Sequence, residues 1–386
     1  MKKRSDIIDL KKGKRNIWFL GGSSFFNDIG SEMISPLLPF YILSFGGGGV
    51  ALGLLSGLRE GLASLFKLLG GWFSDRIGRR KPFVFLGYFL STIFRFLLGL
   101  AGSWQSIIGL VSLERLGKSR DAPRDAIISV STKKRGKGFG IQQMLDSSGA
   151  VLGSLIVLIL FWKFNLDFKT IIFAAAGISI LSLVPLFFVK EPLFKPIRKN
   201  LFKGIKELNN KLKYFIFVVS VFTLANFGLY FFLILRAKEM SGSFVLPIAL
   251  YVLFNFVYAF FSIPFGNLSD KIGRKKVLMM GYVLLFFVSL GFIYSDGIIY
   301  LGSLFLIYGL VYAIVQPNQT AFVADLSGKM KGTALGFYQM IVGLVSIPAG
   351  IIAGLLWNIS FAVMFSYIAL VVLISIVLLG FVREKV

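Results

Sequence analysis

Long apolar segments dominate this sequence. About twelve runs of mainly apolar residues, each near the ~20 residues that a membrane-spanning helix needs, follow one another with short connections. Only helices and closed barrels satisfy their backbone hydrogen bonds in lipid, and these runs are too long for barrel strands. We therefore expect an all-α membrane protein of twelve transmembrane helices. The predicted spans are 17–44, 48–72, 82–101, 105–125, 139–162, 170–189, 214–236, 244–268, 276–295, 298–320, 332–356 and 360–382.

The composition agrees with a membrane environment. Hydrophobic residues make up 56% of the 386 residues, more than a soluble chain of this length can bury. There are 42 Lys and Arg against 18 Asp and Glu, a net charge of +24. The basic residues lie in short clusters between apolar runs, which is typical of cytoplasmic loops and not of a nucleic-acid-binding surface. We expect a lipid bilayer as partner and no nucleic acid.

The connections alternate between basic and nearly neutral. This alternation predicts an even number of spans, with both termini in the cytoplasm, and a multi-pass protein of the cytoplasmic (inner) membrane. The basic connection 190–213 divides the chain into an N-terminal bundle of six helices, 1–189, and a C-terminal bundle of six, 214–386. We interpret this connection as a cytoplasmic linker that lies against anionic headgroups.

Cysteine and histidine are both absent. Their absence from the sequence excludes disulfides, thiol nucleophiles, Ser-His-Asp chemistry and the usual zinc ligands. The complete Gly-x-x-x-x-Gly-Lys-Ser/Thr phosphate-binding loop is also absent from the sequence. We therefore expect neither an enzyme nor a cofactor or metal site, and any proton handling must fall on carboxylates.

One loop sequence occurs twice. Gly71-Trp-Phe-Ser-Asp-Arg-Ile-Gly-Arg-Arg-Lys81 follows the second predicted span, and Gly266-Asn-Leu-Ser-Asp-Lys-Ile-Gly-Arg-Lys-Lys276 follows the eighth. Two such strings at equivalent positions indicate an internal duplication. The alternative is a structural basic turn without a conformational role.

We interpret the repeated loop as a breakable latch between the bundles. The first glycine would let helices approach closely, and the second, at 78 and 273, would permit a tight turn. The aspartate can face the positive end of another helix, while the arginines hold headgroups and carboxylates. We expect Arg120 and Arg124, with Asp121 and Asp125, to pair with Asp75, and Asp146 to be a hinge contact. The predicted latch residues are Gly71, Asp75, Arg76, Gly78, Arg79, Arg120, Arg124, Asp146, Asp270 and Arg274.

The Gly-x-x-x-Asp-Arg-x-Gly-Arg-Arg-Lys pattern resembles the signature loop of the major facilitator superfamily. Further stretches match a prokaryotic branch that resembles multidrug and small-molecule permeases. They are Asn27–Pro36, Gly117–Ala126, Gly138–Gly140, Asp146–Gly153 and Gly332–Gly336. The resemblance implies two pseudo-symmetric six-helix bundles, a central cavity and alternating access by rocking. Ser154 stands where the family's antiporter signature usually has proline, which leaves the direction of antiport open.

Ionisable residues inside predicted spans are candidate functional groups, because charges at bilayer depth are costly. Asp28 and Glu32 lie four residues apart on one helix face, where two carboxyl groups could exchange a proton or contact substrate. Arg115 resembles the family's arginine of the fourth span, which by analogy takes part in proton relay. The alternative for each is a structural ion pair, such as Arg115 with Glu32, Glu60 or Glu114. The full set is Asp28, Glu32, Arg59, Glu60, Lys67, Glu114 and Arg115.

Uncharged polar residues predict the walls of a substrate cavity. They are Asn27, Asn226, Tyr230, Asn255, Tyr258, Tyr312, Gln316 and Asn318, mostly in the C-terminal half. Amide, hydroxyl and aromatic groups suit an amphipathic or aromatic solute more than a simple ion. Pro264, Pro317 and Pro348 are candidate helix breaks or kinks near such a site.

These features predict a monomeric secondary active transporter of small organic solutes. The favoured form is proton-coupled efflux by an antiporter, with sodium as the other possible coupling ion. Two alternatives stay open: an importer or uniporter of a nutrient, metal or metal complex, and a lipid-handling protein or non-transporting membrane sensor.

Overall fold

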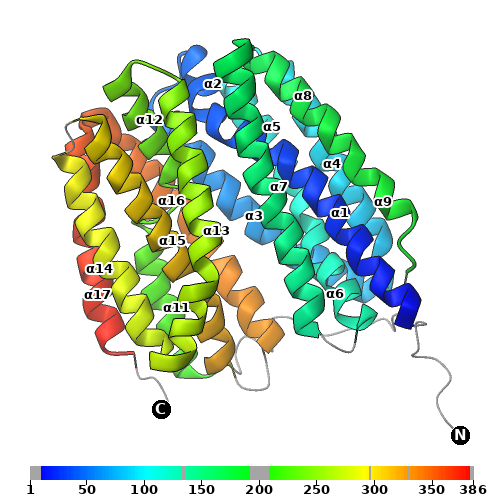
Figure 1. Ribbon diagram of the computed structural model, residues 1–386. Helices are drawn as coiled ribbons and strands as arrows, with labels where there is room; N and C mark the ends of the chain where they lie inside the picture. Colours follow the sequence, from blue (N-terminus) through cyan, green and yellow to red (C-terminus); the bar gives the residue numbers. More distant parts are fainter. Residues whose placement is uncertain (1–9, 133–134, 192–207, 295–296, 328–330, 383–386) are drawn as a thin grey trace, which may run out of the picture. The chain divides into compact units, whose positions relative to one another are not determined.

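The structure is a computed structural model that describes residues 10–132, 135–191, 208–294, 297–327 and 331–382. In these ranges every regular element is a helix (Figure 1). The first half contains α1 (Leu10–Ile34), η1 (Ser35–Leu37), α2 (Leu38–Ser44), α3 (Gly49–Ile77), α4 (Lys81–Gly99), α5 (Trp104–Glu114), η2 (Arg115–Arg120), α6 (Asp121–Ser131), α7 (Arg135–Phe164), α8 (Phe168–Ile180), η3 (Leu181–Leu183) and α9 (Val184–Phe187). The second half contains α11 (Asn210–Thr223), α12 (Tyr230–Ser241), α13 (Val245–Ile272), α14 (Arg274–Ile293), α15 (Ile298–Leu326), α16 (Lys331–Ile359) and α17 (Phe361–Gly380).

The predicted all-helical membrane architecture is confirmed. Among the described residues, 9 helical segments are long and apolar enough to cross a membrane. The other three predicted spans, 17–44, 105–125 and 214–236, fall on helices that are interrupted: α1–η1–α2, α5–η2–α6 and α11–α12. Interrupted helices are tolerated at membrane depth only where protein or water satisfies the freed backbone groups. These three breaks therefore mark places where polar side chains are expected.

The three prolines named as candidate helix breaks or kinks do not break their helices. Pro264, Pro317 and Pro348 lie inside α13, α15 and α16, each of which continues through its proline. A proline removes one backbone hydrogen bond, which neighbouring helices in a membrane bundle can compensate. The breaks of the three interrupted spans lie instead at 35–37, 115–120 and 224–229, and η3 joins α8 to α9.

The chain forms two compact units. The first comprises residues 1–37 and 65–199, and the second 38–64 and 200–386. Thus α2 and the first half of α3 pack with the C-terminal half of the chain. The predicted bundles 1–189 and 214–386 stay a prediction, and most of the predicted linker 190–213 lies outside the described residues.

In the first unit, α1 packs most extensively against α7, and Figure 1 shows the two helices side by side. Glycines allow this approach. A Cβ at Gly149 or Gly153 would overlap the backbone carbonyls of Phe25 or Ile29. Small residues at such positions bring helix backbones together where lipid supplies no hydrophobic drive for association.

In the second unit, a glycine seam joins the first half of α3 to α16. Gly49 and Gly53 of α3 lie directly against Gly354 and Gly350 of α16, so that a Cβ on either side would overlap a carbonyl of the other. Gly57 continues the seam against the backbone of Ser346 and Ile347. The four-residue spacing places all three α3 glycines on one helix face.

The repeated loop forms the same turn in both units. Gly78 has φ +75° and Gly273 has φ +101°, conformations that L side chains rarely adopt, which confirms the predicted tight turns. Ser74 Oγ donates to the Gly71 carbonyl at 2.9 Å, and Ser269 Oγ donates to the Gly266 carbonyl at 2.7 Å. The two first glycines differ, however. A Cβ at Gly71 would lie 3.0 Å from Ala122 Cβ, whereas one at Gly266 would meet nothing within 4 Å among the described residues.

We predict that Gly53→Ala destabilises the protein because the added methyl overlaps the Gly350 carbonyl. The expected loss is ~1–3 kcal/mol of unfolding free energy, typical of overpacking. Thermal unfolding in detergent, followed by circular dichroism, measures it. Gly302→Ala is the matched control, because its Cβ would sit 3.8 Å from Leu250 Cδ2 and should cost nothing. Equal melting temperatures for the two variants would contradict the seam.

Candidate functional site

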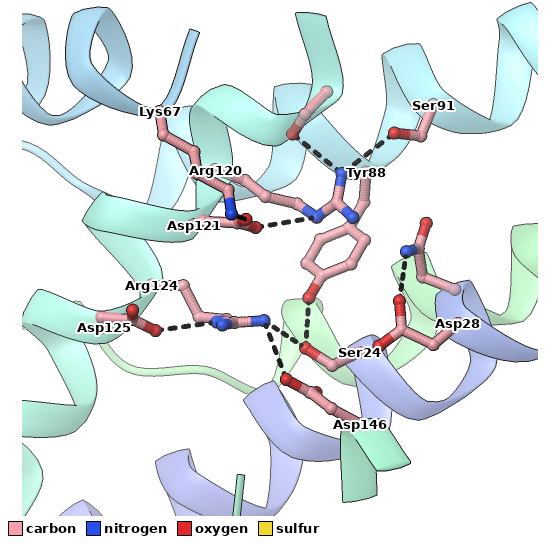
Figure 2. Close-up of polar contacts among 12 residues, drawn as sticks. Ser24, Asp28, Lys67, Tyr88, Ser91, Arg120, Asp121, Arg124, Asp125 and Asp146 are labelled. Carbon is pink, nitrogen blue, oxygen red and sulfur yellow. Dashed lines mark hydrogen bonds and ion pairs between the residues drawn. The ribbon is translucent and has the colours of Figure 1, made fainter. Parts of the chain in front are cut away.

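The ionisable side chains of the first unit form one buried network. It lies among α1, the second half of α3, α4, η2, α6 and α7 (Figure 2). Charges at this depth are tolerated only when they pair with one another or with polar groups.

Tyr88 of α4 and Ser24 of α1 are its centre. Both side chains are fully buried, and Ser24 Oγ lies 2.7 Å from the Tyr88 hydroxyl. Ser24 Oγ also accepts from Gln142 Nε2 of α7 at 2.7 Å and from Arg124 Nη1 of α6 at 2.8 Å. One serine thus connects four helices. Figure 2 shows its contacts with Tyr88 and Arg124.

Arg124 connects two carboxylates. Its Nε donates to Asp125 Oδ1 at 3.1 Å, and its Nη1 lies 3.7 Å from Asp146 Oδ2 on α7. Gln142 Nε2 also donates to Asp146, at 2.7 Å. Asp146 is therefore a contact between α6 and α7 within the first unit.

Arg120 holds the other face of Tyr88. Its guanidinium carbon lies 4.3 Å from the centre of the tyrosine ring, and its Nη1 donates to Ser91 Oγ at 2.9 Å. Its Nε lies 3.8 Å from Asp121 Oδ1, and Lys67 Nζ reaches the same carboxylate at 3.2 Å. A cation over a buried aromatic ring gains free energy because few waters compete for it.

Arg95 of α4 forms a second centre with Glu114 and Arg115. Arg95 Nη2 donates to Glu114 Oε1 at 2.9 Å, and Arg115 pairs with the other carboxylate oxygen. Arg95 Nη1 donates to the Asn27 carbonyl at 2.9 Å and to Ser179 Oγ at 2.8 Å. All three charged side chains are more than nine-tenths buried.

Asp28 lies between these two centres. It is half-buried, accepts a hydrogen bond from Asn27 Nδ2 at 3.0 Å and interacts electrostatically with Arg95, Arg120 and Asp146. Glu32, one helical turn further along α1, is also half-buried. Asp28 thus lies within electrostatic reach of both centres, in which the predicted carboxylates Glu114 and Asp146 are direct members.

The predicted latch pairs differ from those in the structure. Asp75 pairs with Arg80 at 2.6 Å, and Arg120 and Arg124 bind Tyr88, Ser24 and the nearby carboxylates instead. The reason is depth: Arg120 and Arg124 point into the buried network, whereas Asp75 lies in the last turn of α3, beside the loop. In the second unit Arg274 pairs with Asp270 and, at 3.2 Å, with Asp325. Arg79 is exposed, and Arg76 lies 5.4 Å from the Trp72 ring centre.

Sequence reasoning missed the uncharged members of the network. Ser24, Tyr88 and Gln142 are conspicuous only as polar groups in apolar helices. Arg80 and Asp325 were also not singled out. The signal for Tyr88 was weak, because tyrosine is common in membrane helices.

The second unit holds an aromatic cluster with few charges. Phe254 of α13 and Tyr308 and Tyr312 of α15 have ring centres 5.1–5.3 Å apart, and Tyr258 lies 5.9 Å from Tyr312. The Tyr308 hydroxyl donates to Asn226 Oδ1 at 3.2 Å. Asn226 lies in the break 224–229 between α11 and α12, where polar groups were expected.

Of the other predicted cavity residues in this unit, some lie near the aromatic cluster and others do not. Tyr230 stacks near this cluster, 5.6 Å from Tyr251. Asn318 is buried, and its Nδ2 donates to the Ile314 carbonyl of the same helix, while Gln316 is exposed. Gln319, outside the predicted set, accepts from Tyr338 at 3.1 Å and donates to Tyr282 at 3.0 Å.

Arg59 and Glu60 of α3 belong to the second unit and differ in environment. Arg59 is buried, with its guanidinium carbon 5.7 Å from the Phe231 ring centre. Glu60 is exposed and lies within electrostatic range of the Tyr312 hydroxyl. No group of three or more His, Cys, Asp or Glu side chains in the described ranges could hold a metal ion.

Comparison with known proteins gives the family. The model of the Major Facilitator Superfamily matches residues 20–350 and 238–386. An uncharacterized MFS-type transporter of Methanocaldococcus jannaschii is 48% identical over 378 residues, which cover 95% of each chain. Multidrug resistance protein MdtH of Sodalis glossinidius is 22% identical over 328 residues, 82% of this chain and 79% of that protein.

Solved structures agree on the fold. A mutant of the nucleoside transporter NupG superposes with TM-score 0.81 at 14% sequence identity, covering 96% of this chain and 100% of that one. Identity this low shows a shared fold and nothing about substrate. With the helical membrane architecture, the duplicated loop and the match along the whole chain, this protein is a multi-pass membrane transporter that belongs to the Major Facilitator Superfamily.

Proposed function

We propose that this protein is a secondary active transporter that exports small organic solutes in exchange for protons, by alternating access. Its place would be the cytoplasmic membrane, with both termini in the cytoplasm, as the basic loops indicate. Similarity to a protein named for multidrug resistance supports the direction of transport. Import or uniport of a nutrient would be the outcome if the measured flux ran the other way.

The observation that carries proton coupling is the position of Asp28. This half-buried carboxylate interacts with two arginines from α4 and η2 and with Asp146 of α7. Gaining or losing a proton there would change the charge balance among three or more helices at once. A ligand shifts a conformational equilibrium only by binding two states with different affinity. A carboxylate so surrounded would meet that requirement for the proton, because a movement of these helices would change the charges around it.

The acidic and basic side chains around Asp28 have separate parts in this proposal. Arg95, held by Glu114 and Ser179, would keep one positive charge fixed beside Asp28. Arg124 is shared between Asp125 and Asp146, so protonation of either carboxylate would leave it free to move toward the other. Glu32 would extend the proton path along the same face of α1.

Alternating access would use the glycine seam of the second unit. Segment 38–64 is continuous in sequence with the first half of the chain but packs on α16. A rocking movement that carries this segment with its own half would have to open the seam. Backbones in contact through glycine separate without unlocking long side chains, which suits a contact that must re-form in every cycle.

We predict that neutralising both carboxylates, with Asp28→Asn and Glu32→Gln together, lowers proton-driven transport about tenfold or more. Uptake into proteoliposomes under an imposed pH gradient, with internal pH reported by a dye, measures substrate and proton flux together. Asp167→Asn is the control, because Asp167 is an exposed helix cap whose role asparagine can fill. Transport with undiminished proton flux in the double variant would refute proton coupling through α1.

We predict that a disulfide between positions 56 and 228 stops transport reversibly. A Cβ at Gly228 would lie 3.0 Å from Ser56 Cβ, about half an ångström closer than the ~3.5–4.5 Å of a disulfide, so a small separation of the two segments brings the thiols into range. Because the sequence has no cysteine, Ser56→Cys with Gly228→Cys introduces the only two thiols. Oxidation should reduce transport to about a tenth, since the bond would hold segment 38–64 on the C-terminal half, and a reductant should restore it. Each single-cysteine variant is a control, and full transport by the oxidised double variant would argue against opening at this contact.

A further inference from the structure

An exposed carboxylate in the middle of a membrane-spanning helix needs a partner. Glu60 is eleven residues into α3, about 17 Å along the helix axis, which is close to mid-membrane. No ion pair in the described part of the chain involves it. Facing lipid would be costly for a carboxylate at this depth, so an aqueous space or a bound cation is the remaining environment.

The neighbour of Glu60 is an aromatic cluster. Its carboxylate is within electrostatic range of Tyr312, whose ring meets Phe254, Tyr258 and Tyr308 edge-on or tilted, with centres 5.1–5.9 Å apart. Tyr258 and Tyr312 lie about 20 Å from the starts of α13 and α15, at the same depth as Glu60. The faces of such rings are electron-rich and attract cations.

Two amides add hydrogen-bonding capacity beside the rings. Asn226 lies in the break between α11 and α12 and accepts from Tyr308. Asn255 is on α13 between Phe254 and Tyr258, and its Nδ2 is buried with no hydrogen-bond partner among the described residues. A buried donor without a partner is costly, and a ligand oxygen or nitrogen would satisfy it.

The charge beside the tyrosines favours a cationic ligand over an anionic one. Arg59 is the nearest cation in sequence, but its guanidinium is buried against Phe231. The group left exposed beside the tyrosines is the carboxylate of Glu60. A negative charge together with electron-rich ring faces attracts an organic cation and repels an anion of the same shape.

We propose that Glu60, with Tyr258 and Tyr312, forms a binding site for organic monocations that carry aromatic rings. This assignment rests on the transport function proposed above and names its substrate class. The carboxylate supplies the counter-charge, and the rings take the apolar body of the ligand.

A pair of ions with the same shape and opposite charge tests the proposal. Equilibrium binding of tetraphenylphosphonium and of tetraphenylborate is measured on the purified full-length protein in detergent, with binding to empty micelles subtracted. We expect tetraphenylphosphonium to bind and tetraphenylborate to bind at least about tenfold more weakly. Equal affinity for the two ions would overturn the proposal.

Variants assign the binding to this site. Glu60→Gln should weaken tetraphenylphosphonium binding about tenfold or more, because it removes the charge and keeps the shape. Tyr312→Phe should change the affinity less than threefold, whereas Tyr312→Leu should weaken it about tenfold, since only leucine removes the ring. Glu239→Gln, at the end of α12, is the matched control and should bind as the unmodified protein does. An unchanged affinity in Glu60→Gln, with melting temperature retained, would place the cation elsewhere.

The binding assay and the transport assay can fail separately. Loss of proton coupling in the Asp28 and Glu32 variants concerns the first unit and leaves tetraphenylphosphonium binding as it was. If binding is lost in Glu60→Gln while proton flux proves independent of Asp28 and Glu32, the cation site stands and the coupling mechanism falls. The reverse result would retain the coupling mechanism and remove the cation site.

Discussion

Arg95, Glu114 and Arg115 illustrate the constraint on which the whole structure depends. The hydrocarbon core of a membrane contains no water that could hydrogen-bond to polar groups. Each charge at membrane depth must meet an opposite charge, a hydroxyl or a carbonyl, and the first unit satisfies this by sharing partners. Ser24 serves Tyr88, Arg124 and Gln142 together, and Tyr88 also lies under Arg120. Because the partners are shared, a change at one member must redistribute hydrogen bonds over several helices. That property is useful to a protein that alternates between states.

The two units solve the same problem with different chemistry. In the first, paired charges fill the interior between α1, α4, α6 and α7. In the second, tyrosines and amides do so, and Glu60 of α3 stands out as an exposed charge beside them. This division gives the proposed mechanism two separate parts, proton handling on one side and cation binding on the other. The duplicated loop indicates an internal duplication, so the two halves share a framework and differ in the chemistry of their interiors.

Backbone contact is the second means of holding helices together. Glycine brings α1 against α7 and α3 against α16, since lipid offers no hydrophobic gain from association. The α3 glycines can be recognised in the sequence by their four-residue spacing from Gly49 to Gly61. Their partners could not be foreseen, because a glycine face fits any similar face. The assignment of 38–64 to the second unit depends on that choice of partner.

Properties local to the chain could be predicted from the sequence alone. The apolar runs predicted the helices, the repeated loop predicted the turns at Gly78 and Gly273, and the motif predicted the family. Most pairings of side chains could not be predicted, although Arg115 with Glu114 was among the alternatives. Arg124 was expected at Asp75 and lies instead at Asp146, and the helix breaks lie at 35–37, 115–120 and 224–229 instead of at the interior prolines. Periodicity and turn geometry depend on neighbouring residues, whereas the partner of a buried charge depends on which helices face each other and at what depth, and only the tertiary structure decides that.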